Sequence, residues 1–180
     1  MSTPADTAEF TRLLEIFDAK RRFEEMFAAH LSRYLGDRVG VYTSFSEDKI
    51  DGTTASVFLD FQEGGTYNNI SVPKTELTGE TEESAWSAEL SITAITPRKG
   101  VSYIAQNDLV KRIRAAMTRG LLFACPELNA LEDYFINRPT FGGRNDSIGD
   151  DKYDQSDLTY NFNYFTRPGI WAIKNNQPQG

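Results

Sequence analysis

The stretch Trp86–Thr96, WSAELSITAIT, shows the clearest periodicity in the chain. Apolar residues occupy every second position, and Ser, Glu or Thr occupy the positions between them. Because successive side chains of a strand point to opposite faces of its sheet, this alternation predicts a strand with one buried and one hydrated face. Such strands are typical of antiparallel sheets that are covered on one side.

Further stretches show the same alternation. Val39–Ser46 and Ala55–Gln62 are separated by a segment that contains the turn signal Asp51-Gly52, so the sequence predicts that they form a hairpin. Leu158–Tyr164 is expected to be a late strand of the same sheet. Shorter candidate strands are Tyr67–Val72 and Leu131–Asn137.

A long N-terminal segment has the 3.6-residue period of a helix instead of the two-residue period of a strand. Asp6 and Glu9 have the spacing of a capping box, and the sequence predicts a helix from there to Gly36. Its apolar stripe has the i, i+3, i+4, i+7 spacing, with Phe10, Leu13, Leu14 and Phe17 in the first half and Phe23, Phe27, Leu31 and Tyr34 in the second.

Three charged residues, Lys20, Arg21 and Glu24, interrupt this apolar stripe. One interpretation is that the helix kinks near Lys20, or that its N-terminal half projects and contacts a partner. The other is that the long side chains reach solvent and that Lys20 pairs with Glu24 one turn later.

A second helix is expected after Asn107, which is a suitable N-cap residue. Its predicted buried face consists of Leu109, Val110, Ile113, Ala116 and Met117. With the strands above, the 180 residues predict one α+β domain over residues 1–180. We expect a mainly antiparallel sheet of about four to five strands, flanked by the long N-terminal helix and the second helix, with long loops at residues 74–84 and 140–156.

Composition limits the classes of partner. The net charge of −7 argues against a general binder of nucleic acids or anionic membranes, because both require a basic surface. Cys125 is the single cysteine, which excludes an internal disulfide and a Cys-rich metal site and predicts a reducing, cytoplasmic setting. The apolar segments are too short to span a bilayer.

No catalytic pattern emerges from the residues. His30 is the one histidine and lies at the margin of a helical stripe, and Cys125 has the surroundings of a small core residue. Gly142-Gly143-Arg144 lacks the Lys-Ser/Thr of a phosphate-binding loop. We therefore expect no enzyme activity, no cofactor and no metal ion.

Two arrangements of acidic residues would favour chemistry or metal binding instead. Asp60 and Glu89 lie on hydrated strand faces and could be neighbours, as an acid–base pair would require. Five aspartates of the 140–156 segment and its surroundings could gather around calcium, although their spacing does not match an EF-hand: Asp146, Asp150, Asp151, Asp154 and Asp157.

Candidate interface residues fall in two groups. The second helix carries Lys111, Arg112, Arg114 and Arg119 on its outer side. They could form a solvated face, salt bridges to an acidic neighbouring subunit, or a contact with DNA. The first helix contributes the apolar residues Phe10, Leu13 and Phe17.

The closing stretch Asp157–Thr166, DLTYNFNYFT, followed by Pro168-Gly169-Ile170-Trp171, completes an order of long helix, strand hairpin, strong strand, second helix and late strand. This order resembles that of the tail-terminator (tail-completion) proteins of tailed bacteriophages. The resemblance extends over Phe10–Trp171 in element order and assigns no role to any residue.

The resemblance implies a structural virion protein that forms a homo-hexameric ring and joins the tail tube to the neck. It further implies assembly in the host cytoplasm, contacts with the tail tube protein and with neck or connector proteins, DNA only as passing cargo, and no membrane. The alternatives are another phage neck or connector subunit, a non-viral α+β interaction module, or an enzyme that uses acids on the hydrated sheet face.

Overall fold

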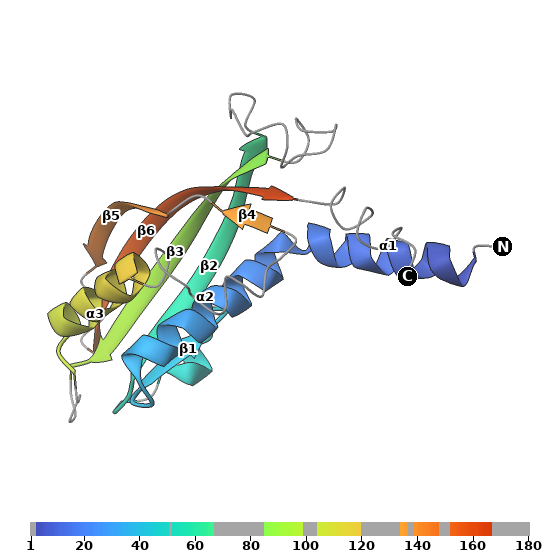
Figure 1. Ribbon diagram of the computed structural model, residues 1–180. Coiled ribbons are helices and arrows are strands. Elements are labelled where there is room, and N and C mark those ends of the chain that lie inside the picture. The colour runs from blue at the N-terminus through green and yellow to red at the C-terminus, as the bar shows by residue number, and fades with distance from the viewer. Residues whose placement is uncertain are drawn as a thin grey trace.

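The protein is an α+β structure in which two helices cover one face of a six-stranded sheet (Figure 1). The computed structural model describes residues 3–50, 52–66, 85–98, 104–119, 134–136, 139–147 and 152–166. The helices are α1 (Pro4–Phe17), α2 (Ala19–Leu35), the short 3-10 helix η1 (Glu47–Lys49) and α3 (Gln106–Arg119). The strands are β1 (Val39–Tyr42), β2 (Ala55–Thr66), β3 (Ala85–Pro97), β4 (Tyr134–Ile136), β5 (Thr140–Ser147) and β6 (Tyr153–Thr166).

The sheet is mostly antiparallel and has the order β1-β2-β3-β6-β4, with β5 also paired to β6. The strands expected over Trp86–Thr96 and Leu158–Tyr164 are confirmed, and they pair with each other along β3 and β6. The tentative strand within Leu131–Asn137 corresponds to β4. The candidate strand Tyr67–Val72 lies outside the described residues.

The predicted hairpin is wrong. β1 pairs with β2 in parallel, in a register that runs from Val39 opposite Ala55 to Tyr42 opposite Phe58. Parallel neighbours need a connection that carries the chain back along the strand, and residues 43–54, which include η1, make that return. The turn signal therefore falls inside a crossover rather than at a hairpin tip.

The predicted loop over residues 140–156 is also wrong. Thr140–Ser147 forms β5 and pairs antiparallel with β6, which already begins at Tyr153. The register shifts between Phe141 and Gly143, and a Cβ on Gly142 would lie 2.6 Å from Nδ2 of the Asn161 side chain and 3.3 Å from the backbone carbonyl oxygen of Thr159. A glycine thus permits a bulge at an edge strand, where we expected it to mark a loop. The other expected loop, residues 74–84, lies outside the described residues.

Two helices replace the single long N-terminal helix that the sequence predicted. Asp18 leaves helical geometry with φ −88° and ψ 50°, so α1 and α2 meet at a break two residues before Lys20. The capping box lies earlier than expected: Thr3 donates its backbone N–H to Asp6 at 2.8 Å, and the Asp6 N–H is 3.3 Å from the Thr3 hydroxyl. Pro4, between them, occupies the first helical position, where its missing N–H is harmless.

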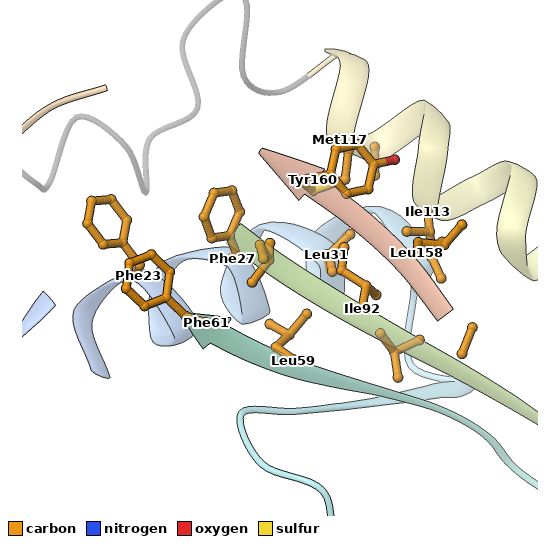
Figure 2. Close-up of a cluster of buried hydrophobic side chains, with 14 of the residues drawn as sticks. Phe23, Phe27, Leu31, Leu59, Phe61, Ile92, Ile113, Met117, Leu158 and Tyr160 are labelled. Carbon is orange, nitrogen blue, oxygen red and sulfur yellow. The ribbon is translucent and has the colours of Figure 1, made fainter. Parts of the chain in front are cut away.

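The core lies between the sheet and helices α2 and α3 (Figure 2). Phe23 of α2 stacks on Phe61 of β2 with ring centroids 5.3 Å apart, and it meets Phe162 of β6 edge-on at 5.6 Å. The five residues predicted for the buried face of the second helix are all buried: Leu109, Val110, Ile113, Ala116 and Met117. Burial of these faces fixes both helices on the same side of the sheet.

The expected cap at Asn107 is not used as one, because α3 begins at Gln106. The Gln106 side chain accepts from the Thr96 hydroxyl at 2.7 Å and donates to the Ala94 carbonyl at 2.9 Å. Its amide also lies 2.9 Å from the Ser156 hydroxyl, so one side chain joins the start of α3 to β3 and β6.

A charged pair on α2 binds the main chain of β2. Glu24, only 7% exposed, accepts the backbone N–H of Phe61 at 3.0 Å, and Lys20 donates to the Phe61 carbonyl at 3.0 Å. Lys20 and Glu24 also pair with each other at 2.7 Å, as the second interpretation of the charged stripe predicted. Beyond the end of β1, these side chains take the place of a neighbouring strand.

We expect Glu24→Ala to lower the free energy of unfolding by about 1–3 kcal/mol, because it leaves the buried N–H of Phe61 without an acceptor. Glu24→Gln keeps an acceptor oxygen and should lose less. The matched control is Glu25→Ala, which removes an exposed partner of Arg21 and should change stability by no more than about 0.5 kcal/mol. Chemical denaturation measures all three, and equal losses for Glu24→Ala and Glu25→Ala would contradict the assignment.

Candidate interaction surfaces

Helix α1 extends away from the sheet and from α2 and α3 (Figure 1). Asp6, Phe10 and Leu14 follow one another at i, i+4 spacing and therefore share one face of the helix. Phe10 is 63% exposed and Leu14 is 55% exposed. The side chains of the other two predicted apolar residues, Leu13 and Phe17, lie outside the described part of the chain. A projecting helix with large apolar side chains in solvent is a candidate contact surface.

The basic residues of α3 do not form one patch. Positions 112 and 114 are separated by about 200° around a helix of 3.6 residues per turn. Arg114 lies over the Phe141 ring of β5 with its guanidinium carbon 4.3 Å from the centroid, whereas Arg112 lines a groove on the opposite flank. Around the helix, Lys111 lies between Arg112 and Arg114. It is exposed, and its ammonium nitrogen is 3.5 Å from a carboxylate oxygen of Asp108. The side chain of Arg119 falls outside the described residues.

The groove beside Arg112 lies where α2 ends and β1 begins. Gly36 has φ +79° and turns the chain there, which a residue with a side chain rarely does. The groove has a volume of about 310 Å³, and its lining combines apolar side chains with charged ones: Leu35, Gly36, Asp37, Arg38, Val39, Ile104 and Arg112. It is the second candidate contact surface.

The hydrated face of the sheet holds a shallow depression of about 700 Å³ near the ends of β2 and β3. Glu89 lies in it beside amide and hydroxyl side chains such as Asn161 and Ser87. Asp60 is not part of this lining: it pairs with Ser91, whereas Glu89 pairs with Gln62, so the two acids are diagonal neighbours.

The surroundings of Asp60 suit an ion pair better than proton transfer. Its carboxylate lies 2.9 Å from the Lys20 ammonium, and hydrogen bonds from Lys20 and Gln62 lower its pKa. Burial lowers the pKa of Lys20, but its hydrogen bonds to Glu24 and Asp60 act in the opposite direction, and the pKa is raised overall. Asp60 therefore stays ionised, which is unsuitable for a general acid at neutral pH.

Three of the aspartates considered for calcium lie on β5 and β6 and have other partners. Asp146 accepts from the Ser156 hydroxyl at 2.6 Å and from Arg144 at 2.7 Å, and these hydrogen bonds lower its pKa. Asp154 pairs with Arg98 at 2.7 Å, and Asp157 accepts from Thr93 at 2.7 Å. Asp150 and Asp151 lie outside the described residues, and within the described ranges no cluster of three metal-ligating side chains occurs.

His30 and the Gly142-Gly143 pair, also considered for chemistry, have structural surroundings. His30 is buried between α2 and α3, with its Nε2 2.8 Å from the Ala116 carbonyl and its ring 5.0 Å from that of Tyr34. Gly142 and Gly143 belong to the β5 bulge. Cys125 lies outside the described residues.

Comparison with known proteins adds no assignment: no protein-family model matches the chain, and no curated protein matches it significantly. Within the described segments, no helix is both long and apolar enough to cross a membrane. The candidate contact surfaces are thus α1, with exposed Phe10 and Leu14, and the groove beside Arg112.

Removal of the Asp60 charge should change the pH dependence of stability. The pKa of Asp60 is lower in the folded protein than its unfolded value of about 3.9, so its contribution is present above about pH 4 and is lost as the pH falls through the folded pKa. We expect Asp60→Asn to be less stable than the wild type by about 0.2–1 kcal/mol at neutral pH, because the pair with Lys20 is exposed. The difference should vanish in acid. Urea denaturation over a range of pH measures it, and a difference independent of pH would contradict the ion-pair role.

Proposed function

We propose that this protein is a structural assembly subunit, and specifically a tail-terminator-like ring subunit of a tailed bacteriophage. In this proposal it forms a homo-hexamer in the virion that joins the tail tube to the neck or connector, after assembly in the host cytoplasm. It acts through protein–protein contacts, without catalysis, cofactor or metal, and DNA only passes through the ring.

The observation that carries the proposal is the projection of α1. A helix that keeps Phe10 and Leu14 in solvent gains nothing from them within its own subunit, whereas burial of each against a partner would contribute roughly 1.5–3 kcal/mol. The break at Asp18 directs α1 away from the body before α2 joins the core. This geometry favours contact with another polypeptide.

The order of elements supports the narrower part of the proposal. The strong strand β3, the second helix and the late strand β6 follow one another in the order on which the resemblance to tail terminators rests, although the strand hairpin is replaced by a parallel pair and the long helix is divided into α1 and α2. Helices α2 and α3 cover one face of a mostly antiparallel sheet. Closed rings need two different surfaces on each subunit, and α1 and the groove beside Arg112 are two such surfaces.

A second candidate function is a non-viral module that binds one protein partner through α1. The same exposed Phe10 and Leu14 favour it, and the size of the assembly distinguishes it from the ring subunit. A neck or connector subunit of another type would also form a ring, and the ring or filament it joins would separate it from a tail terminator.

Light scattering combined with negative-stain imaging tests the proposal. We expect the purified protein to form sixfold rings with a mass six times the 20.3 kDa of the chain. Phe10→Ser with Leu14→Ser should abolish the rings and leave circular dichroism and thermal unfolding of the subunit unchanged, because neither side chain contributes to the core. The matched control is Ala8→Ser, an exposed position about 160° around α1 from Phe10, which should assemble as the wild type does.

Rings that persist in the double variant would refute the role of α1. A protein that stays monomeric alone and with isolated tail tubes, yet binds one partner in equimolar ratio, would replace the ring subunit with the single-partner module.

A further inference from the structure

We infer that α1 of one copy binds in the groove beside Arg112 of the next copy, with Phe10 as the side chain that enters it. The inference rests on the proposed function and names both the partner, a second copy of this chain, and the surface that receives α1.

The groove offers apolar contacts to an incoming side chain. Three apolar side chains line the groove: Leu35 and Val39, which are buried, and Ile104, which is half-buried. Its volume of about 310 Å³ is at the small end for ligand pockets and suits one large side chain. Aromatic anchors in such pockets dominate many protein interfaces. Phe10, the most exposed large apolar side chain of the described residues, is the corresponding anchor.

The groove and α1 carry charges of opposite sign. Arg38 and Arg112 line the groove with a single acid, Asp37. The sequence of α1 contains three acidic residues and one arginine, and Asp6 lies one turn before Phe10 on the same face. Asp6 uses its Oδ2 atom to cap the helix at Thr3, so its other carboxylate oxygen can accept from a guanidinium. Over the described ranges, Arg112 has no ion-pair partner in its own subunit, which fits a partner supplied by the next copy.

The positions of α1 and the groove in the subunit set the direction of the contact between copies. Helix α1 precedes the first residue of α2, Ala19, and the groove begins at its last, Leu35. The 17 residues of α2 span about 25 Å, so α1 and the groove of the same subunit lie at opposite ends of this helix. A contact between two different surfaces at opposite ends is head-to-tail, and it produces a ring when the rotation between subunits closes.

Mixing of two defective variants tests the pairing. The first, Phe10→Ser with Leu14→Ser, retains an intact groove. The second, Arg38→Glu with Arg112→Glu, retains an intact α1. Each should be a monomer by light scattering, and an equimolar mixture should give a heterodimer of twice the chain mass, because the intact α1 of the second fits the intact groove of the first. The matched control, Arg33→Glu with Lys111→Glu, has the same charge change on exposed residues outside the groove and should assemble normally.

Disulfide trapping extends the test to weak assembly. On a Cys125→Ser background that keeps Phe10, Thr7→Cys with Ile104→Cys should give a ladder of cross-linked oligomers on oxidation, because exposed Thr7 lies one turn before Phe10 on the same side of α1. Ala8→Cys with Ile104→Cys, with position 8 about 160° around α1 from Phe10, should not, since cross-linking needs Cα atoms within about 7 Å. Equal cross-linking in both pairs, or none in either, would overturn the inference. If the groove variant assembles like the wild type while the α1 variant does not, the groove is wrong and the proposed ring survives. A monomeric wild type that also resists trapping and does not bind tail tubes would remove both.

Discussion

The hydrogen bonds from α2 to the main chain of Phe61 orient this helix on the sheet. β1 stops at Tyr42, opposite Phe58, so among the described residues no strand lies beside the backbone of β2 beyond that point on this edge. Glu24 and Lys20 satisfy the N–H and the carbonyl of Phe61 and so fix the rotation of α2. With that rotation fixed, the aromatic side chains of α2 enter the core and its C-terminal end borders the groove.

Periodicity predicted the parts of the fold that are decided by burial. The alternation over Trp86–Thr96 and Leu158–Tyr164 identified the two central strands, and the 3.6-residue spacing from Leu109 to Met117 identified the buried face of α3. These features follow from the burial of one face of an element, which produces a periodic pattern within a single stretch of sequence. The interruption of the stripe at Lys20 likewise pointed to the break before α2 and to the pair with Glu24, because charges inside an apolar stripe need a local explanation.

Pairing partners and edge strands could not be predicted in the same way. A turn signal such as Asp51-Gly52 is local, whereas the parallel register of β1 depends on where α2 delivers the chain at Gly36. β5 has the Gly- and Asp-rich composition of a loop, and it is a strand because β6 offers it an unpaired edge. For the candidate site, Phe10 and Arg112 stay predicted interface residues, whereas the separation of Arg112 from Arg114 and the groove beside Arg112 required the geometry of neighbouring elements.

The charged pair on α2 also limits which surfaces can cause aggregation. An unpaired strand edge invites another chain to extend the sheet, and natural proteins block such edges with charged side chains or covering helices. Lys20 and Glu24 block the edge of β2 at Phe61, and on β5 the exposed Arg144 and Asp146 play a similar part. Association by strand addition is thereby disfavoured at both places, so neither strand edge serves as an accidental template for a second chain.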